Sequence, residues 1–328
     1  MNYKQSGVDV VAGEKAVDTI KSTVKKTYNN NVLSGLGSFG GLYKLELSKW
    51  KEPIMVSSTD GVGTKIIIAQ KAKIYNTIGQ DLVNHCVNDI FVQGAIPQFF
   101  LDYIGISNID IAIINQIIDG MSLACIENGL ALVGGEMAEM PDIYKKDDFD
   151  LVGTIVGLVE KKNLVTGETI KKDDVILGFP STGLHTNGYS LARKIIFEKL
   201  KLGLDDYVPE IGDTVKDAML KIHKSYYPIL NKYAENHMIN GMAHITGGGL
   251  YNNIKRVVPE GLTAFIDKKS WEIPSLFNWL IKSGEVEEED AYRAFNMGIG
   301  FVVITTPDNA KIIMKENDCM QIGKIIIP

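Results

Sequence analysis

Apolar residues recur at helical spacing in three stretches of the first half of the chain. The pattern predicts helices over residues 13–27, 77–93 and 111–128, and Gly129 follows the third as a C-terminal stop. In the second stretch the apolar stripe consists of Ile78, Leu82, Val83, Cys86, Val87, Ile90 and Phe91. Each of these helices is therefore expected to bury one face against the rest of the protein.

The second predicted helix also has a polar side that is rich in carboxylates. At about 100° per residue, Asp81, His85 and Asn88 fall opposite the apolar stripe, and Asp89 lies beside them. This side is expected to face away from the core and to be available for chemistry.

Shorter apolar runs between glycine-containing turns predict β-strands in both halves of the chain. The predicted strands are residues 54–56, 130–133, 151–159, 175–179 and 302–304, and the run 66–68 is also β-like. A further helix is expected after residue 188, through Leu191, Ile195 and Leu200. Helices and strands mixed in both halves predict an α/β fold. The turn-rich segment around residue 165 divides it into domains 1–165 and 166–328.

Composition limits the class of protein but names no activity. The chain has 328 residues, of which 45% are hydrophobic and 23% charged, as is typical of a globular protein. A net charge of −6 disfavours a nucleic-acid partner. No apolar run is long enough for a membrane span, and the start lacks a secretory pattern. Three widely separated cysteines have no metal-ligand spacing, so we expect reduced thiols in a cytoplasmic protein.

Two glycine-rich segments of the first half have features of phosphate-binding loops. Gly35, Gly37 and Gly40 match the letters of a dinucleotide fingerprint, but they follow a helix rather than a strand, so we interpret the segment as a mobile lid over phosphates. Residues 60–65 read Asp-Gly-Val-Gly-Thr-Lys, which lacks the spacing of a Walker loop. Lys65 is nevertheless a candidate partner for a polyphosphate.

Three carboxylates are candidate ligands of a hard cation. Asp60, Asp89 and Glu136 each lie at the edge of an apolar element beside glycine or a small polar residue. Mg2+ takes such oxygen ligands and bridges them to phosphates. The alternative is that each is an ordinary turn or cap residue, since Asp-Gly is a common turn dipeptide.

His185 is the best histidine for proton transfer. It lies in the polar turn between the strand 175–179 and the following helix, a layout that directs free backbone N–H groups at an anion. The alternative is a histidine that only satisfies local backbone groups. His85 and His244 are weaker candidates.

Five motifs together give the chain a specific resemblance to a known family. They are Ser58-Thr59-Asp60-Gly61-Val62-Gly63-Thr64-Lys65, Asp81 to Ile90, Gly134-Gly135-Glu136-Met137-Ala138-Glu139-Met140-Pro141, His185-Thr186-Asn187-Gly188-Tyr189-Ser190 and His244-Ile245-Thr246-Gly247-Gly248-Gly249. In this order and spacing the chain resembles the phosphoribosylformylglycinamidine cyclo-ligases of purine biosynthesis. The resemblance runs from Gly7 to about Ile326.

The resemblance implies an ATP-dependent ligase that forms a C–N bond, with Mg2+ as a second cofactor. Formylglycinamidine ribonucleotide and ATP would give aminoimidazole ribonucleotide, ADP and phosphate, through phosphorylation of the formyl amide oxygen and attack of the amidine nitrogen. It also implies a two-domain fold of the aminoimidazole ribonucleotide synthetase type. The N-terminal domains of two copies would form a β-barrel in a homodimer.

The resemblance also assigns roles by position. Nucleotide contacts would come from Lys21, Gly35, Gly37, Gly40, Asp60, Gly61, Gly63, Thr64, Lys65, Asp89 and Glu136, with Asp60 and Asp89 holding the metal. Substrate contacts would come from Ser181, Thr182, Gly183, His185, Asn187, Gly247, Gly248 and Gly249. The catalytic residues would be His185, Asp89 and Lys65.

Two other classes of function remain open at this point. One is another enzyme of the same ATP-using superfamily, such as a selenophosphate synthetase, a thiamine-monophosphate kinase or a hydrogenase-maturation protein. A selenophosphate synthetase would need a reactive cysteine in an N-terminal loop, and no cysteine precedes Cys86. The other is a nucleotide-binding scaffold that binds ATP without turnover.

Overall fold

The computed structural model describes residues 9–328, and the chain forms two compact units. Unit 1 comprises the chain up to Val62, Ala69–Ile90 and Ala95–Lys161; unit 2 comprises Gly63–Ile68, Phe91–Gly94 and Lys162–Pro328. Each unit is described by itself. The proposed domain boundary near residue 165 stays a prediction.

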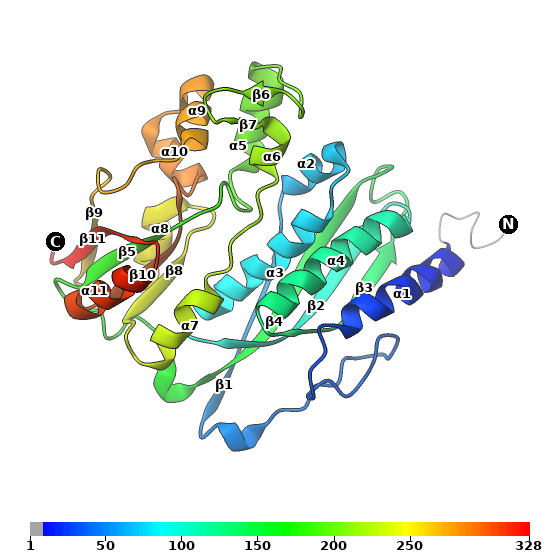
Figure 1. Cartoon of the computed structure of the whole chain (residues 1–328), viewed down its shortest axis with the longest axis horizontal. Coiled ribbons are helices and arrows are strands. Elements are labelled where there is room, and N and C mark those ends of the chain that lie inside the picture. Colours follow the sequence, from blue (N-terminus) through cyan, green and yellow to red (C-terminus); the bar gives the residue numbers. More distant parts are fainter. Residues whose placement is uncertain (1–8) are drawn as a thin grey trace. The chain divides into compact units, whose positions relative to one another are not determined.

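Unit 1 is built on a four-stranded sheet with the order β1-β4-β2-β3. Its strands are β1 (Pro53–Gly61), β4 (Phe149–Glu160), β2 (Ile96–Ile106) and β3 (Ala131–Glu139). Strands β2 and β3 are parallel, and the other pairs are antiparallel. Helices α1 (Val10–Lys25), α3 (Asn76–Phe91) and α4 (Ile111–Glu127) lie over one face of this sheet (Figure 1). The side chains of Asp9 and Asp110 cap the N-termini of α1 and α4 by accepting backbone N–H groups of the first turn.

Two glycines let α3 and α4 approach each other closely. A Cβ atom on Gly79 would lie 2.1 Å from the carbonyl oxygen of Ile117, and one on Gly120 would lie 2.0 Å from that of Asn76. Larger residues at either position would push the helices apart, so these glycines fix the place of α3. The predicted polar side of α3 is held in a defined position and is itself buried at Asp81, His85 and Asn88, so the expectation that this side faces away from the core is wrong.

Unit 2 is built on a five-stranded sheet with the order β8-β10-β5-β11-β9, in which every neighbouring pair is antiparallel. Its strands are β5 (Val175–Pro180), β8 (Gly241–His244), β9 (Thr263–Ile266), β10 (Ile299–Thr305) and β11 (Met320–Ile326), and β6 (Tyr207–Val208) pairs with β7 (Asp213–Thr214). Its helices are α5 (Tyr189–Arg193), which continues as the π-helical η4 (Lys194–Lys199), then α6 (Val215–Met219), α7 (Tyr227–Glu235), α8 (Gly249–Lys255), α9 (Ser275–Gly284), α10 (Glu288–Ala294) and α11 (Pro307–Glu316).

The core of unit 2 is aromatic where β5 and β10 meet. Tyr226 stacks on Phe301 with 5.1 Å between ring centroids, and Phe91 stacks on the same ring at 5.9 Å. Phe179 and Leu230 belong to the same buried cluster. This packing holds the end of β5, from which the predicted substrate turn departs.

The structure confirms the predicted helices, and it corrects three details of the strands. The run 66–68 lies in helix α2 (Lys65–Ala72), so the β-like interpretation is wrong; a short apolar run does not distinguish a buried strand from a buried helix. The strand predicted at 54–56 continues to Gly61 as β1, because it pairs with β4 along its whole length. Strand β3 likewise continues past 133, so Glu136 lies within a strand rather than in a turn after it.

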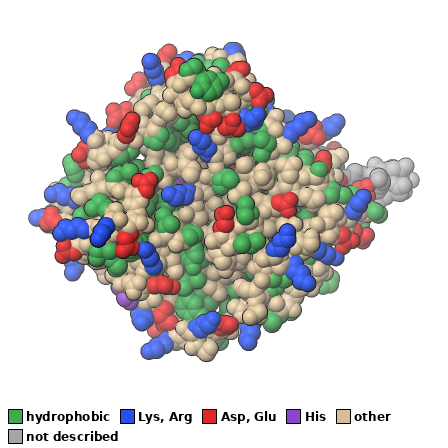
Figure 2. All heavy atoms as spheres, viewed as in Figure 1, with side chains coloured by type: hydrophobic (Ala, Val, Ile, Leu, Met, Phe, Trp, Pro, Cys, Tyr) green, Lys and Arg blue, Asp and Glu red, His purple; other side chains and the backbone are tan. Residues whose placement is uncertain are grey.

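The described residues also bear on the expectations from composition. Within residues 9–328, no helix is both long enough and apolar enough to cross a membrane. All three cysteines are free, and Cys86 and Cys125 are buried. On the face drawn in Figure 2, basic and acidic side chains are interspersed, whereas nucleic-acid-binding proteins usually gather basic residues in one patch.

Candidate functional site

Unit 1 brings together one histidine and two of the predicted metal-binding carboxylates. Asp60 lies near the end of β1, and His85 and Asp89 lie one turn apart on α3. The Nε2 atom of His85 is 2.8 Å from Oδ2 of Asp60, at hydrogen-bond distance, and 3.5 Å from Oδ2 of Asp89. Ser58 Oγ donates a hydrogen bond of 3.3 Å to Asp89 Oδ2. One ligand atom from each of His85, Asp60 and Asp89 lies within 4.8 Å of the others, which is a spacing that a single cation can bridge.

The three side chains differ in exposure. The His85 side chain is 4% exposed, whereas those of Asp60 and Asp89 are 50% and 22% exposed. Burial alone would lower the pKa of His85, but the hydrogen bond that its ring donates to Asp60 and the charges of Asp89, Asp60 and Asp81 outweigh burial and raise the pKa. The site is thus anchored by a buried imidazole and opens to solvent through its carboxylates.

A cavity of about 570 Å³ lies beneath the glycine-rich loop of unit 1. Gly35, Gly37, Gly40 and Glu136, all predicted nucleotide contacts, line it. Apolar side chains from α1, α4 and β3 make up much of the remaining wall. The volume and the mainly apolar lining are typical of a pocket for a small molecule.

Lys21 lies outside this cavity. Its ammonium pairs with Asp18 at 2.7 Å, and its side chain is 50% exposed. It lines a neighbouring hollow of about 530 Å³, which shares Gly13, Val17 and Met137 with the cavity. A ligand that extends from one hollow into the other would reach Lys21.

Asp102 is a carboxyl group of the cavity wall that the sequence analysis did not select. Burial raises its pKa to about 7; a hydrogen bond from its own backbone opposes the shift, and the charge of Glu136 adds to it. It also requires Gly135 beside it, since a Cβ there would lie 2.2 Å from Asp102 Oδ1. With its pKa raised to about 7, the Asp102 carboxyl changes charge near neutral pH.

Replacing Asp102 by Asn is expected to stabilise the protein at high pH and to change little at low pH. In the unfolded chain the pKa is about 3.9, so between about pH 4 and 7 the folded state holds the proton more tightly and the wild type loses stability as pH rises. Asn removes this loss. We expect a gain of roughly 1–3 kcal/mol at pH 8 and little at pH 4, measured by chemical denaturation. Parallel stability curves for the two proteins across this range would contradict the prediction.

In unit 2 the structure places Gly63, Thr64 and Lys65 beside the predicted substrate segments. Thr64 Oγ1 lies 3.1 Å from Ser190 Oγ. Lys65 is completely buried, and its ammonium donates a 2.7 Å hydrogen bond to the carbonyl oxygen of Lys221. The structure thus gives Lys65 a packing role in unit 2, and its predicted contact with phosphate stays a prediction.

The predicted substrate turn after β5 is tied down by its own polar atoms. Ser181 Oγ donates to Asn296 Oδ1 at 3.0 Å, and Asn296 Nδ2 donates to the carbonyl oxygen of Gly183 at 2.8 Å. The backbone N–H of Thr182 donates to Nε2 of His185 at 3.2 Å. A neutral His185 therefore carries its proton on Nδ1. His185 is 1% exposed and has a φ of 61°, so it lies inside the turn rather than at its surface.

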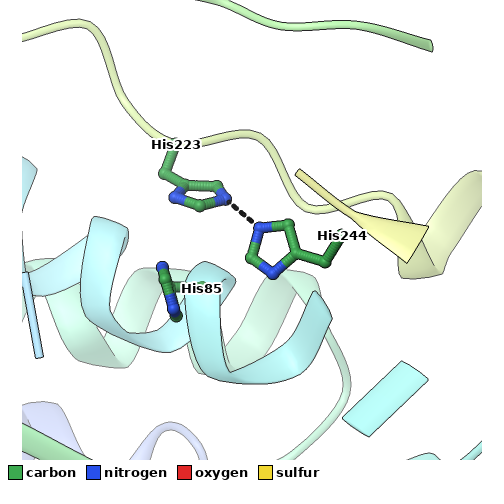
Figure 3. Close-up of side chains that lie close together, drawn as sticks. All are labelled: His85, His223 and His244. Carbon is green, nitrogen blue, oxygen red and sulfur yellow. Dashed lines mark hydrogen bonds between the residues drawn. The ribbon is translucent and has the colours of Figure 1, made fainter. Parts of the chain in front are cut away.

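Three buried histidines of unit 2 contact one another in series. The rings of His185 and His223 stack at 4.0 Å. Nε2 of His223 lies 3.0 Å from Nε2 of His244, the contact drawn as a dashed line in Figure 3. Nδ1 of His223 is 3.3 Å from the hydroxyl of Thr186. Because two Nε2 atoms share one hydrogen bond, one of them donates and the other is unprotonated. At this contact, therefore, only one of the two Nε2 atoms of His223 and His244 carries a proton.

The second predicted substrate segment is a tight glycine turn before α8. Gly248 and Gly249 have φ angles of 92° and 72°, and a Cβ on Gly249 would lie 1.7 Å from the carbonyl oxygen of Tyr292. The side chain of Asn253 donates to the carbonyl oxygen of Gly249 at 2.8 Å. Glycine is required here by both conformation and space.

Gly300→Ala is expected to disturb the packing around Tyr226 and His185 by overcrowding. The new Cβ would lie 2.1 Å from the hydroxyl of Tyr226 and 2.5 Å from Cε1 of His185. Overpacking of this kind typically costs about 1–3 kcal/mol. We expect a lower midpoint of thermal unfolding, with Gly203→Ala in an uncrowded loop as the control. Equal midpoints for the two variants would show that the ring of His185 has room to move.

Comparison with known proteins decides the family. The family model described as AIR synthase related protein, N-terminal domain, matches residues 46–159, and the corresponding C-terminal domain matches residues 171–326. The phosphoribosylformylglycinamidine cyclo-ligase of Geobacillus thermodenitrificans is 47% identical over 308 residues, covering 94% of this chain and 89% of the relative. That of Alkaliphilus oremlandii is 45% identical over 309 residues, covering 94% and 91%. The chain belongs to the phosphoribosylformylglycinamidine cyclo-ligase family.

Solved structures show that the cyclo-ligase fold is shared with enzymes of other chemistry. Thiamine-monophosphate kinase from Stenotrophomonas maltophilia superposes with a TM-score of 0.69 at 15% identity, covering 95% of this chain and 94% of that one. The hydrogenase maturation protein HypE in complex with ATP gives 0.65 at 16% identity, covering 94% and 85%. At such low identity these structures support the fold alone. The predicted family and the predicted two-domain α/β fold are confirmed.

Sequence reasoning missed several residues that the structure places beside the predicted site residues. Asp102, His223 and Gly300 lie outside the glycine-rich motifs, and their neighbours are distant in the sequence. The four-residue spacing of His85 and Asp89 did indicate a shared helix face. It gave no sign that Asp60 completes the group.

Proposed function

We propose that this chain catalyses the ATP-dependent closure of an imidazole ring in purine biosynthesis. It converts formylglycinamidine ribonucleotide and ATP to aminoimidazole ribonucleotide, ADP and phosphate. The observation that carries the proposal is the identity of 44–47% to cyclo-ligases over nearly the full length of both chains.

Ring closure requires that the formyl amide oxygen of the substrate be converted into a good leaving group. The γ-phosphoryl group moves to the formyl amide oxygen, the amidine nitrogen attacks the same carbon, and the C–O bond breaks as phosphate departs. Little covalent work falls to the protein, which must position two ligands and neutralise charge. The residues proposed below therefore bind and orient rather than react.

The nucleotide is assigned to unit 1. We place its base and sugar in the cavity under the loop that contains Gly35, Gly37 and Gly40, because this is the roomy, mainly apolar hollow among the described residues of unit 1. The phosphates extend toward the Asp60-Gly61 end of β1. Lys21 and Glu136 stay proposed nucleotide contacts of unit 1, and the nucleotide contacts that the resemblance implies for Gly63, Thr64 and Lys65, which belong to unit 2, stay predictions.

The carboxylates of Asp60 and Asp89 fit a divalent cation such as Mg2+. They supply charged oxygens on the open side of the cluster and leave coordination positions for phosphate oxygens. A divalent ion bound there would supply charge neutralisation for the transferring phosphoryl group. Asp60 and Asp89 hold it, and Ser58 orients Asp89 through its hydrogen bond.

The formylglycinamidine substrate is assigned to unit 2. Ser181, Thr182, Gly183, Asn187 and Gly247–Gly249 offer backbone N–H groups and short polar side chains in two adjacent turns, a combination suited to a phosphate ester. His185 lies behind the first turn and accepts the N–H of Thr182, so we give it a positioning role alongside the predicted proton transfer.

We also propose that the chain acts as a homodimer through residues 1–165, with residues 166–328 as a separate α/β domain. Strand β1 is an edge strand of its sheet, and Met55 on it is 60% exposed. Leu47 and Phe39, also in unit 1, are exposed as well. Apolar groups at an open sheet edge favour association with a second copy. Analytical ultracentrifugation tests this assembly, and a cytoplasmic location stays a prediction.

The test of the proposed function is a coupled assay for ADP and aminoimidazole ribonucleotide. Both products should appear in equal amounts when the formylglycinamidine substrate is supplied, and neither when it is withheld. Purified protein that binds ATP but forms neither product would favour a nucleotide-binding scaffold. ADP formed without substrate would favour a different kinase-like activity.

Shortening the glycine-rich loop is expected to weaken nucleotide binding. Deleting Gly37 to Phe39 removes part of the cavity wall, so we expect the KM for ATP to rise by roughly tenfold while the KM for the other substrate changes less. Gly203→Ala, in an uncrowded loop of unit 2 outside the proposed contacts, is the control, since the atom nearest to a Cβ at this position lies 3.6 Å away. Unchanged kinetics in the deletion variant would contradict the interpretation of this loop as a lid over the nucleotide.

A further inference from the structure

The metal site of unit 1 contains a nitrogen donor in addition to its carboxylates. His85 Nε2 lies nearest to the acidic oxygens, at 2.8 Å from Asp60 and 3.5 Å from Asp89. Mg2+ prefers oxygen ligands and keeps several of its waters, whereas imidazole is a ligand of Mn2+, Co2+, Zn2+ and similar ions. The donor set therefore differs from an ordinary magnesium site.

The spacing of the three atoms suits coordination to a single ion. Two ligands at ~2.1 Å from a metal and at right angles or tetrahedral angles to each other lie roughly 3.0–3.5 Å apart. The two distances from His85 Nε2 fall close to this range, and all three atoms lie within 4.8 Å. His85 and Asp89 are four residues apart on α3, so the helix itself sets the spacing between them.

The burial pattern makes His85 the fixed member of the group. Its side chain is 4% exposed, and Gly79 and Gly120 hold α3 tightly against α4. Asp60 and Asp89 are more exposed and can adjust to an ion. An imidazole held in this way makes the site selective, because a rigid nitrogen ligand increases the affinity only for metal ions that coordinate nitrogen.

We propose that the Asp60–His85–Asp89 site binds a first-row transition-metal dication of the Mn2+ or Co2+ class, with His85 as a direct nitrogen ligand that discriminates against Mg2+. The inference rests on the proposed function only for the use of the ion in the reaction. Binding of the ion needs neither ATP nor the second substrate. The site thus selects its metal through one residue of α3.

The test compares ion binding by the wild type and by His85→Asn in the absence of nucleotide. Calorimetry with CoCl2, MnCl2 and MgCl2 gives the affinities, and the visible absorption of bound Co2+ reports its ligands. Loss of a nitrogen ligand should weaken Co2+ and Mn2+ binding by ~10-fold or more, shift the Co2+ absorption bands and change Mg2+ affinity by less than ~3-fold. His237→Asn, at an exposed histidine of unit 2, is the matched control and should leave all three affinities unchanged.

Two further variants keep the result interpretable. His85→Gln also removes the imidazole nitrogen but keeps a longer side chain, so it serves if His85→Asn unfolds. Asp60→Asn should weaken the binding of all three ions, because it removes a negative charge that attracts each of them. Equal Co2+ affinity and equal spectra in the wild type and both His85 variants would overturn the proposal. So would stronger Co2+ binding after removal of His85, which would mean that the imidazole competes with the ion.

The failure of this inference is distinguishable from the failure of the proposed function. If product forms with Mg2+ and the His85 variants bind Co2+ like the wild type, the proposed cyclo-ligase activity stands and the proposed coordination of the ion by His85 is wrong. If Co2+ binding depends on His85 but no aminoimidazole ribonucleotide forms with any ion, the proposed metal site stands and the proposed cyclo-ligase reaction is wrong.

Discussion

Asp89→Asn is expected to lower the rate of aminoimidazole ribonucleotide formation by ~100-fold or more while changing the free energy of unfolding by about 1 kcal/mol or less. The rate falls because the substitution removes a charge that holds the cation and, through it, the transferring phosphoryl group. Stability changes little because Asn retains an oxygen that accepts from Ser58, and because losing one negative charge relieves repulsion with Asp60.

The measurement pairs turnover in the coupled assay with chemical denaturation of the same preparation. Asp119→Asn, at an exposed position of α4 in the same unit, is the charge-matched control and should leave turnover unchanged. Near-normal turnover in Asp89→Asn would remove Asp89 from the metal site. A parallel loss of stability and turnover would show that its role is structural.

His185→Ala is expected to impair use of the formylglycinamidine substrate by ~100-fold in kcat/KM and to change the KM for ATP by less than ~3-fold. The reason is local to unit 2. His185 accepts the backbone N–H of Thr182 from inside the substrate turn, and its ring stacks on His223 at 4.0 Å. Removing the ring leaves the partly buried N–H group of Thr182 without its acceptor and loosens Ser181 and its neighbours.

A second substitution separates positioning from proton transfer. His185→Gln retains an acceptor near the place of Nε2, so it should restore most of the lost kcat/KM if His185 only holds the turn. It should restore little if the imidazole moves a proton, and the wild-type pH profile would then contain a step that the variant lacks. Equal losses for ATP and for the substrate in His185→Ala would contradict the assignment of His185 to the substrate side.

The candidate site could be read from the sequence only where its residues are close together in the chain. The spacing of His85 and Asp89 predicts that they share one face of a helix, and the structure confirms this. The local pattern predicts a turn at Asp60, whereas pairing with β4 extends β1 to Gly61 and brings the carboxylate of Asp60 to His85. Strand pairing depends on a partner about one hundred residues away, so no local pattern contains it.

Lys65 also has a contact that the sequence alone does not predict. Its position after Asp60-Gly61-Val62-Gly63-Thr64 suggested a free ammonium beside phosphates. In the structure it begins helix α2 and is buried, with its ammonium on the carbonyl oxygen of Lys221. The partner lies 156 residues away, and the sequence does not indicate which residue will supply it.

The sequence by itself determined helices α1, α3 and α4 and the helix after residue 188, strands β1, β3, β4, β5 and β10, the mixed α/β class and, through its five motifs, the family. These depend on local periodicity and on short segments whose residues act together. Only the tertiary structure decided which side chains meet, including Asp60 with His85, Asp102 with the cavity and His223 with both His185 and His244. The physical reason is that a fold places side chains by packing between segments that are distant in the chain, and that packing is a property of the whole core rather than of any single stretch.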